Sequence, residues 1–116
     1  TVRRLNVEWG RACDPAALRA ALAESPADIV AIVHAETSTG VLNPVRELAA
    51  VAREHDALVL VDAVTSFGGH PLEVGAWGID AAYSCTQKCL GAPSGMSPVV
   101  FGPLNRQARS RPQWGV

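Results

Sequence analysis

Two short apolar runs, separated by a helix-like stretch, constrain the fold of this chain more than any other feature. The runs are DIVAIVHA (residues 28–35) and ALVLVDAV (residues 57–64). Both are nearly continuous and rich in β-branched residues, which is typical of parallel strands covered on both faces. Between them, Asn43-Pro44 precedes an apolar stripe at helical spacing, which indicates a helix. The pattern therefore predicts a β-α-β unit with a parallel sheet.

The segment before this unit predicts one more strand and one more helix. Residues 2–9 alternate apolar and polar side chains, which indicates a strand. Asp14-Pro15 then offers a capping residue followed by a proline suited to the first helical position. Leu18 and Leu22 supply an apolar stripe, and we expect this helix to run to about Glu24.

The segment after the unit predicts two further strands. Gly68-Gly69 marks a turn, and short apolar stretches at 78–84 and 97–102 indicate strands. Pro103 is predicted to open a last helix that runs to about Ser110. Strands and helices in this order predict an α/β fold with a mainly parallel sheet.

Composition favours a soluble globular chain with a core of its own. The chain has 116 residues, 48% of them apolar and 18% charged, with a net charge of −1. This charge offers no basic field for nucleic acid or an anionic membrane. No apolar run approaches the roughly 20 residues of a membrane span, and the first ten residues do not form a signal peptide. We therefore expect a cytoplasmic protein with no nucleic-acid or membrane partner.

The three cysteines do not predict a metal site. Cys85 and Cys89 are four residues apart, with no second pair and no histidine beside them, and Cys13 lies far away in the sequence. Structural zinc sites use paired ligands at short spacings. We expect three reduced thiols and no metal.

Three polar clusters follow predicted strands: HAETSTG (34–40), DAVTS (62–66) and SCTQK (84–88). In open α/β sheets, ligands bind beyond the carboxyl ends of the strands. Asp62 has two interpretations, a strand-end acid that caps the following loop or a partly desolvated carboxylate that needs a cationic partner. Lys88, the only lysine, is either an ordinary solvated cation or a partly buried amine nucleophile.

A nucleophilic lysine and a carboxylate on neighbouring strand ends suit pyridoxal phosphate. The cofactor forms a Schiff base with lysine, and an aspartate keeps its ring nitrogen protonated. Thr37, Ser38 and Thr39 could hydrogen-bond the phenolic oxygen of the ring, whereas Thr86 and Gln87 offer donors to the phosphate. The alternative for the hydroxyl cluster is an ordinary turn before a helix.

Three longer motifs resemble the class V aminotransferases: HAETSTGVLNP, LVDAVTSFGGHPLEV and GIDAAYSCTQKCLGAPSGMSPV. The resemblance covers about residues 3–110 and is nearest to the alanine–glyoxylate and serine–glyoxylate (serine–pyruvate) group. It implies part of the large domain of a fold-type I transferase dependent on pyridoxal 5′-phosphate. Residues 1–110 would form this partial domain and 111–116 an irregular tail. The complete protein would be a homodimer.

The resemblance implies the catalytic roles. Lys88 matches the lysine that forms the Schiff base and moves the proton during transamination. Asp62 matches the partner of the pyridine nitrogen. Val64 matches the aliphatic residue that packs on the face of the ring.

The remaining positions match residues that surround the cofactor. Thr37 matches the hydroxyl near the phenolic oxygen, and Gln87 matches the residue that contacts the phosphate. Thr86 is a weaker candidate for the phosphate. His34 and Glu36 match motif positions that we interpret as structural support.

The implied function is transamination, with alanine or serine as amino donor and glyoxylate or pyruvate as acceptor. Family members are longer, so the chain is expected to match their middle third, without the phosphate loop and the substrate-binding arginine. Two alternatives stay open: a non-catalytic truncated module, and a class V lyase or cysteine desulfurase. Desulfurases typically place a histidine before the lysine, where this chain has Gln87, which favours transamination.

Overall fold

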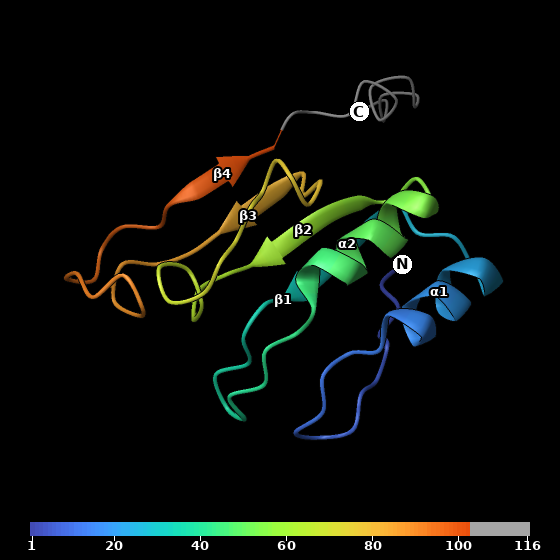
Figure 1. The fold of residues 1–116 in the computed structure, drawn as a ribbon, viewed down its shortest axis with the longest axis horizontal. Helices are drawn as coiled ribbons and strands as arrows, with labels where there is room; N and C mark the ends of the chain where they lie inside the picture. The colour runs from blue at the N-terminus through green and yellow to red at the C-terminus, as the bar shows by residue number, and fades with distance from the viewer. Residues whose placement is uncertain (103–116) are drawn as a thin grey trace.

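The chain forms one four-stranded sheet with two helices, as Figure 1 shows. The computed structural model describes residues 1–102. The strands lie in the order β1-β2-β3-β4; β1, β2 and β3 are parallel, and β4 is antiparallel to β3. The predicted α/β fold with a mainly parallel sheet is confirmed. The elements are α1 (Pro15–Glu24), β1 (Ile29–Val33), α2 (Val45–Glu54), β2 (Leu58–Asp62), β3 (Ala81–Tyr83) and β4 (Val99–Phe101).

A side-chain hydrogen bond caps the start of α1, and two others hold the segment that precedes α2. The carboxylate of Asp14 accepts a hydrogen bond from the backbone N–H of Ala16 at 2.9 Å, so α1 begins where the sequence predicts. Ahead of α2, the side chain of Asn43 donates to the carbonyl of Val33 and accepts from the N–H of Cys13, both at 2.8 Å. Asn43 thus fastens the segment before α1 and the start of α2 to the end of β1.

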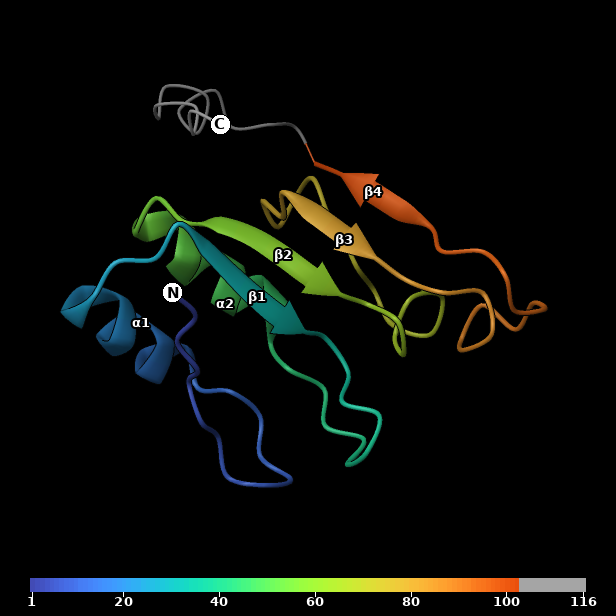
Figure 2. The same cartoon turned by 180° about the vertical axis from the view of Figure 1, so that it is seen from behind.

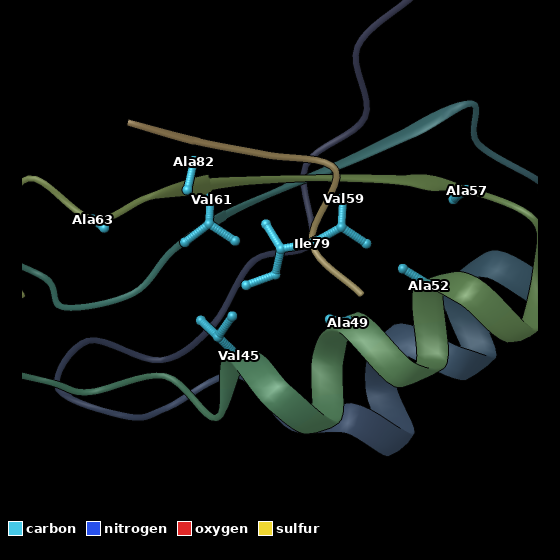
Figure 3. Packing of buried hydrophobic residues seen from close by; sticks show 9 residues of the cluster. All are labelled: Val45, Ala49, Ala52, Ala57, Val59, Val61, Ala63, Ile79 and Ala82. Atoms are coloured by element: carbon cyan, nitrogen blue, oxygen red, sulfur yellow. The ribbon is translucent and has the colours of Figure 1, made fainter. Parts of the chain in front are cut away.

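The core lies between α2 and the sheet (Figure 3). Val45 and Ala49 of α2 face Val59 and Val61 of β2, with Ile79 packed between them. A second cluster joins the two helices to each other, and Val30 and Ile32 of β1 pack against both clusters. Burying an aliphatic side chain of this size stabilises a fold by roughly 1.5–3 kcal/mol. The members of the second cluster are Leu18, Leu22, Leu48 and Val51.

Both helices lie on one face of the sheet, as the two opposite views show (Figures 1 and 2). Within residues 1–102 the other face is uncovered, and Ile29 and Phe101 are 56% and 72% exposed. The expectation that β1 and β2 are covered on both faces is therefore wrong for the described chain. The apolar runs require a layer on each side, but residues 1–102 supply helices for one side only.

The strand predicted at residues 2–9 is wrong, because the structure places no strand there. Alternation alone does not make a strand, since its backbone groups also need a neighbouring strand to pair with. Instead, the guanidinium of Arg3 donates to the carbonyls of Ala21 and Ser25 at the end of α1. The helix predicted from Pro103 lies outside the described residues. Neither described helix has the length and apolar character that crossing a membrane requires.

Candidate active site

The carboxyl ends of β1, β2 and β3 lie together at one edge of the sheet. Val33, Asp62 and Tyr83, the last residues of these strands, are neighbours in register. Each of the three polar clusters contains or directly follows one of these strand ends. The topology therefore brings 34–40, 62–66 and 84–88 to the edge where ligands bind in sheets of this type.

Both oxygens of the Asp62 carboxylate are held by donors from the fold. Oδ1 accepts a hydrogen bond from the N–H of Val64 at 2.9 Å, and Oδ2 accepts one from the hydroxyl of Tyr83 at 2.7 Å. The interpretation of Asp62 as a cap of the following loop is therefore confirmed. It does not exclude the second interpretation, because an ionised carboxylate has about four acceptor positions and two remain.

Thr65 joins all three loops. Its hydroxyl lies 2.8 Å from the hydroxyl of Thr37, and its backbone carbonyl accepts a hydrogen bond from the thiol of Cys89 at 2.9 Å. Cys89 directly follows Lys88, so the lysine-bearing loop is fastened to the loop that follows Asp62. Sequence reasoning did not single out Thr65, although its place inside the DAVTS cluster was a usable signal.

His34 and Ser66 form a buried support beneath these loops. Nδ1 of His34 lies 2.9 Å from the hydroxyl of Ser66, and the rings of His70 and Trp77 contact the His34 ring edge-on. Burial, with a smaller contribution from the charge of His70, lowers the pKa of His34. A neutral imidazole that joins two loops agrees with the expected structural role of His34.

The loop that carries Lys88 packs closely against Gly68-Gly69. A Cβ at Gly69 would lie 2.9 Å from Sγ of Cys89, and Gly68 has a φ of +91°, which a residue with a side chain adopts only with strain. The glycine pair thus permits the approach of the two loops. Lys88 itself is exposed, and its amine has no hydrogen bond or ion pair with residues 1–102.

Thr86 and Gln87 differ in what they can offer a ligand. The hydroxyl of Thr86 donates a hydrogen bond to the carbonyl of Pro93, and the backbone N–H of Thr86 donates one to the carbonyl of Met96. Thr86 is buried and keeps no free proton for an anion. Gln87 is exposed, and its amide has no partner in the described part of the chain.

The hydroxyl-rich turn is shaped mainly by its own side chains. The carboxylate of Glu36 accepts hydrogen bonds from the N–H and the hydroxyl of Ser38, and these bonds lower the pKa of Glu36. The hydroxyl of Thr39 accepts from the N–H of Val41. Ser38 and Thr39 therefore behave as turn residues, whereas Thr37 extends toward Thr65.

The chemistry of this donor set fits pyridoxal phosphate. The edge offers an unpaired amine at Lys88, a carboxylate at Asp62 with acceptor positions left, a hydroxyl at Thr37 and an amide at Gln87. Val64, two residues after Asp62, is half-buried. Residues 1–102 contain no cluster of three His, Cys, Asp or Glu side chains that could hold a metal ion.

Known proteins resemble this chain in both sequence and structure. The family model for class-V aminotransferases matches residues 1–112. The (S)-ureidoglycine–glyoxylate transaminase of Bacillus subtilis is 44% identical over 100 residues, which cover 86% of this chain and 24% of that protein. A 2-aminoethylphosphonate–pyruvate transaminase of Burkholderia lata is 47% identical over 98 residues, covering 84% and 26%. The crystal structure of alanine–glyoxylate aminotransferase from Nostoc sp. superposes with a TM-score of 0.80 at 43% identity, covering 90% and 28%.

The chain belongs to the class-V aminotransferases. Its fold is that of fold-type I transferases, and the family implies pyridoxal 5′-phosphate as cofactor. The chain spans about a quarter of the length of the relatives that it matches.

Proposed function

We propose that this chain provides the lysine-bearing part of the active site of an aminotransferase. The observation that carries the proposal is the set of contacts at Thr65, which fasten the loop after Lys88 to the loop after Asp62 and to Thr37. The loops that carry an amine, a carboxylate and a hydroxyl are thereby held together at one edge of one sheet. Residues 1–110 would then belong to the large domain and 111–116 to an irregular tail.

Each residue has a proposed task. Pyridoxal phosphate, when bound, supplies an electron sink that allows an amino group to move between an amino acid and a 2-oxo acid. The amine of Lys88 would attach the cofactor and, once the amino donor has displaced it, would take the proton from Cα of that donor. Asp62 would accept a hydrogen bond from the ring nitrogen, and Val64 would pack against the ring. Thr37 would donate to the phenolic oxygen, and Gln87 would donate to the phosphate.

We propose alanine or serine as amino donor and glyoxylate or pyruvate as acceptor. The names of the relatives support this choice, because they pair glyoxylate or pyruvate with small amino compounds. The same names make (S)-ureidoglycine and 2-aminoethylphosphonate the next donors to test. We also propose that the complete protein is cytoplasmic and forms a homodimer. Light scattering of the purified protein tests the homodimer.

The first experiment is to trap the cofactor on the protein. The complete protein is incubated with pyridoxal phosphate, reduced with borohydride and digested, and its peptides are analysed by mass spectrometry. We expect the cofactor mass on the peptide that contains Lys88 in the wild type, and not on the corresponding peptide of Lys88→Arg, which keeps the charge but lacks an amine. A wild-type protein without cofactor on Lys88 would contradict the proposal and support the non-catalytic module.

The substrate panel separates transamination from the lyase alternative. Transamination with alanine and glyoxylate yields pyruvate and glycine, whereas a desulfurase given a thiol reductant releases sulfide and alanine from cysteine. We expect the first pair of products and no sulfide. General acid–base catalysis by a side chain typically contributes about 10²–10⁴-fold, so Lys88→Arg should lose at least that factor.

A further inference from the structure

The phenol of Tyr83 is bonded to the carboxylate that the proposed function assigns to the ring nitrogen. Asp62 and Tyr83 are register partners on the parallel strands β2 and β3. Side chains of register partners in neighbouring strands project from the same face of a sheet. The hydroxyl of Tyr83 lies 2.7 Å from Oδ2 of Asp62, the distance of a charge-assisted O–H···O⁻ bond.

Two donors from different directions fix this carboxylate. The N–H of Val64 holds Oδ1 from the following loop, and the phenol of Tyr83 holds Oδ2 from the neighbouring strand. Rotation of the carboxylate would break one or both bonds. The unused acceptor position of each oxygen is therefore directed before any ligand arrives.

Two valines flank the pair in the sheet. Val33 is the register partner of Asp62 on β1, and Val99 is the register partner of Tyr83 on β4. Asp62 and Tyr83 thus lie in one row between two valines. The hydrogen bond to Asp62 raises the pKa of Tyr83, with smaller contributions from burial and from the charge of Asp62. The phenol is therefore a protonated donor near neutral pH.

We propose that Tyr83 is a positioning residue that orients Asp62 toward the ring nitrogen of the cofactor and keeps the shared proton on that nitrogen. The hydrogen bond from the phenol holds Oδ2 of Asp62, so a free acceptor position of the carboxylate stays aligned with the N–H of the ring. An acceptor aligned with that N–H favours the protonated form of the ring nitrogen. This inference rests on the proposed function, since it requires Asp62 to face the ring.

The test uses the complete protein loaded with pyridoxal phosphate that carries ¹⁵N in the ring. The ¹⁵N chemical shift reports the protonation of the ring nitrogen, and a binding titration gives the dissociation constant of the cofactor. Tyr83→Phe removes the hydroxyl and keeps the ring. We expect its ¹⁵N shift to move toward the unprotonated form and its dissociation constant to rise about tenfold, the effect of losing one hydrogen bond to a charged group.

Val99→Ala is the matched control, because it alters the same row of the sheet and touches neither oxygen of Asp62. We expect the wild-type ¹⁵N shift and dissociation constant for this variant. A Tyr83→Phe protein that equals the wild type in both readouts overturns the role of Tyr83 alone. The role of Tyr83 is also overturned if Val99→Ala changes the ¹⁵N shift and the dissociation constant as much as Tyr83→Phe does. A wild type in which Lys88 never carries the cofactor overturns the proposed function, and this inference with it.

Discussion

Nδ1 of His34 and the hydroxyl of Ser66 lie 2.9 Å apart, and the two side chains are only 3% and 0% exposed. Ser66→Ala would leave the imidazole without this partner inside the fold. Losing one partner of a buried hydrogen bond costs about 1–3 kcal/mol. We expect the free energy of unfolding in urea to fall by that amount. Ser94→Ala is the control, because Ser94 is exposed, and should change the value by less than about 0.5 kcal/mol. Equal losses in both variants would contradict the role of the pair.

The lowered pKa of His34 predicts acid sensitivity. Because burial and the nearby His70 lower the pKa of His34, the unfolded chain binds a proton at this site at a higher pH than the folded protein does. Below about pH 6.5, the ordinary histidine value, stability therefore falls with falling pH until the lower, folded-state pKa is passed. Urea unfolding across this window should show a smaller slope of stability against pH in His34→Gln than in the wild type. A wild-type slope in this variant would show that His34 does not titrate differently in the two states.

Much of the fold could be predicted because each element has a local cause in the sequence. Asp14-Pro15 predicts where α1 begins, and the apolar runs predict β1 and β2 within a residue or two. The strand expected at residues 2–9 failed because pairing depends on a neighbouring strand, which alternation cannot supply. The expectation that β1 is covered on both faces failed for a similar reason, since no segment within residues 1–102 covers the second face of this strand.

The sequence predicted which residues make up the candidate site better than it predicted the contacts between them. The motif spacing singled out Lys88 and Asp62, and the parallel strands place their clusters at one edge. The bond from Tyr83 to Asp62 could not be predicted, because it depends on the register of β2 against β3. The bond from Cys89 to Thr65 depends on the path of two loops, for which no periodic pattern exists.

Gly68 lies in the turn that packs against the loop of Lys88, so a side chain added there should have a larger effect than one added at Gly75. Gly68→Ala would place a side chain at a φ of +91° and a Cβ 3.2 Å from Leu90. The backbone strain costs about 1–2 kcal/mol, and the loop after Lys88 must move. We expect lower stability and slower trapping of the cofactor by borohydride. Gly75→Ala is the matched control, because its Cβ would meet nothing within 4 Å. Equal trapping rates in the two variants would show that this packing does not position Lys88.

Thr86 and Gln87 are neighbours with opposite expected effects on the cofactor phosphate. Gln87→Ala should weaken binding of pyridoxal phosphate roughly tenfold, since one hydrogen bond to a charged group is lost, and should leave binding of pyridoxal, which has no phosphate, unchanged. Thr86→Val removes a buried hydroxyl that bonds the carbonyl of Pro93, so it should lower stability by about 1 kcal/mol and change both affinities by the same factor. The measurement is a pair of binding titrations on each variant. A selective loss of pyridoxal phosphate binding in Thr86→Val would reverse the assignment and make Thr86 the phosphate donor.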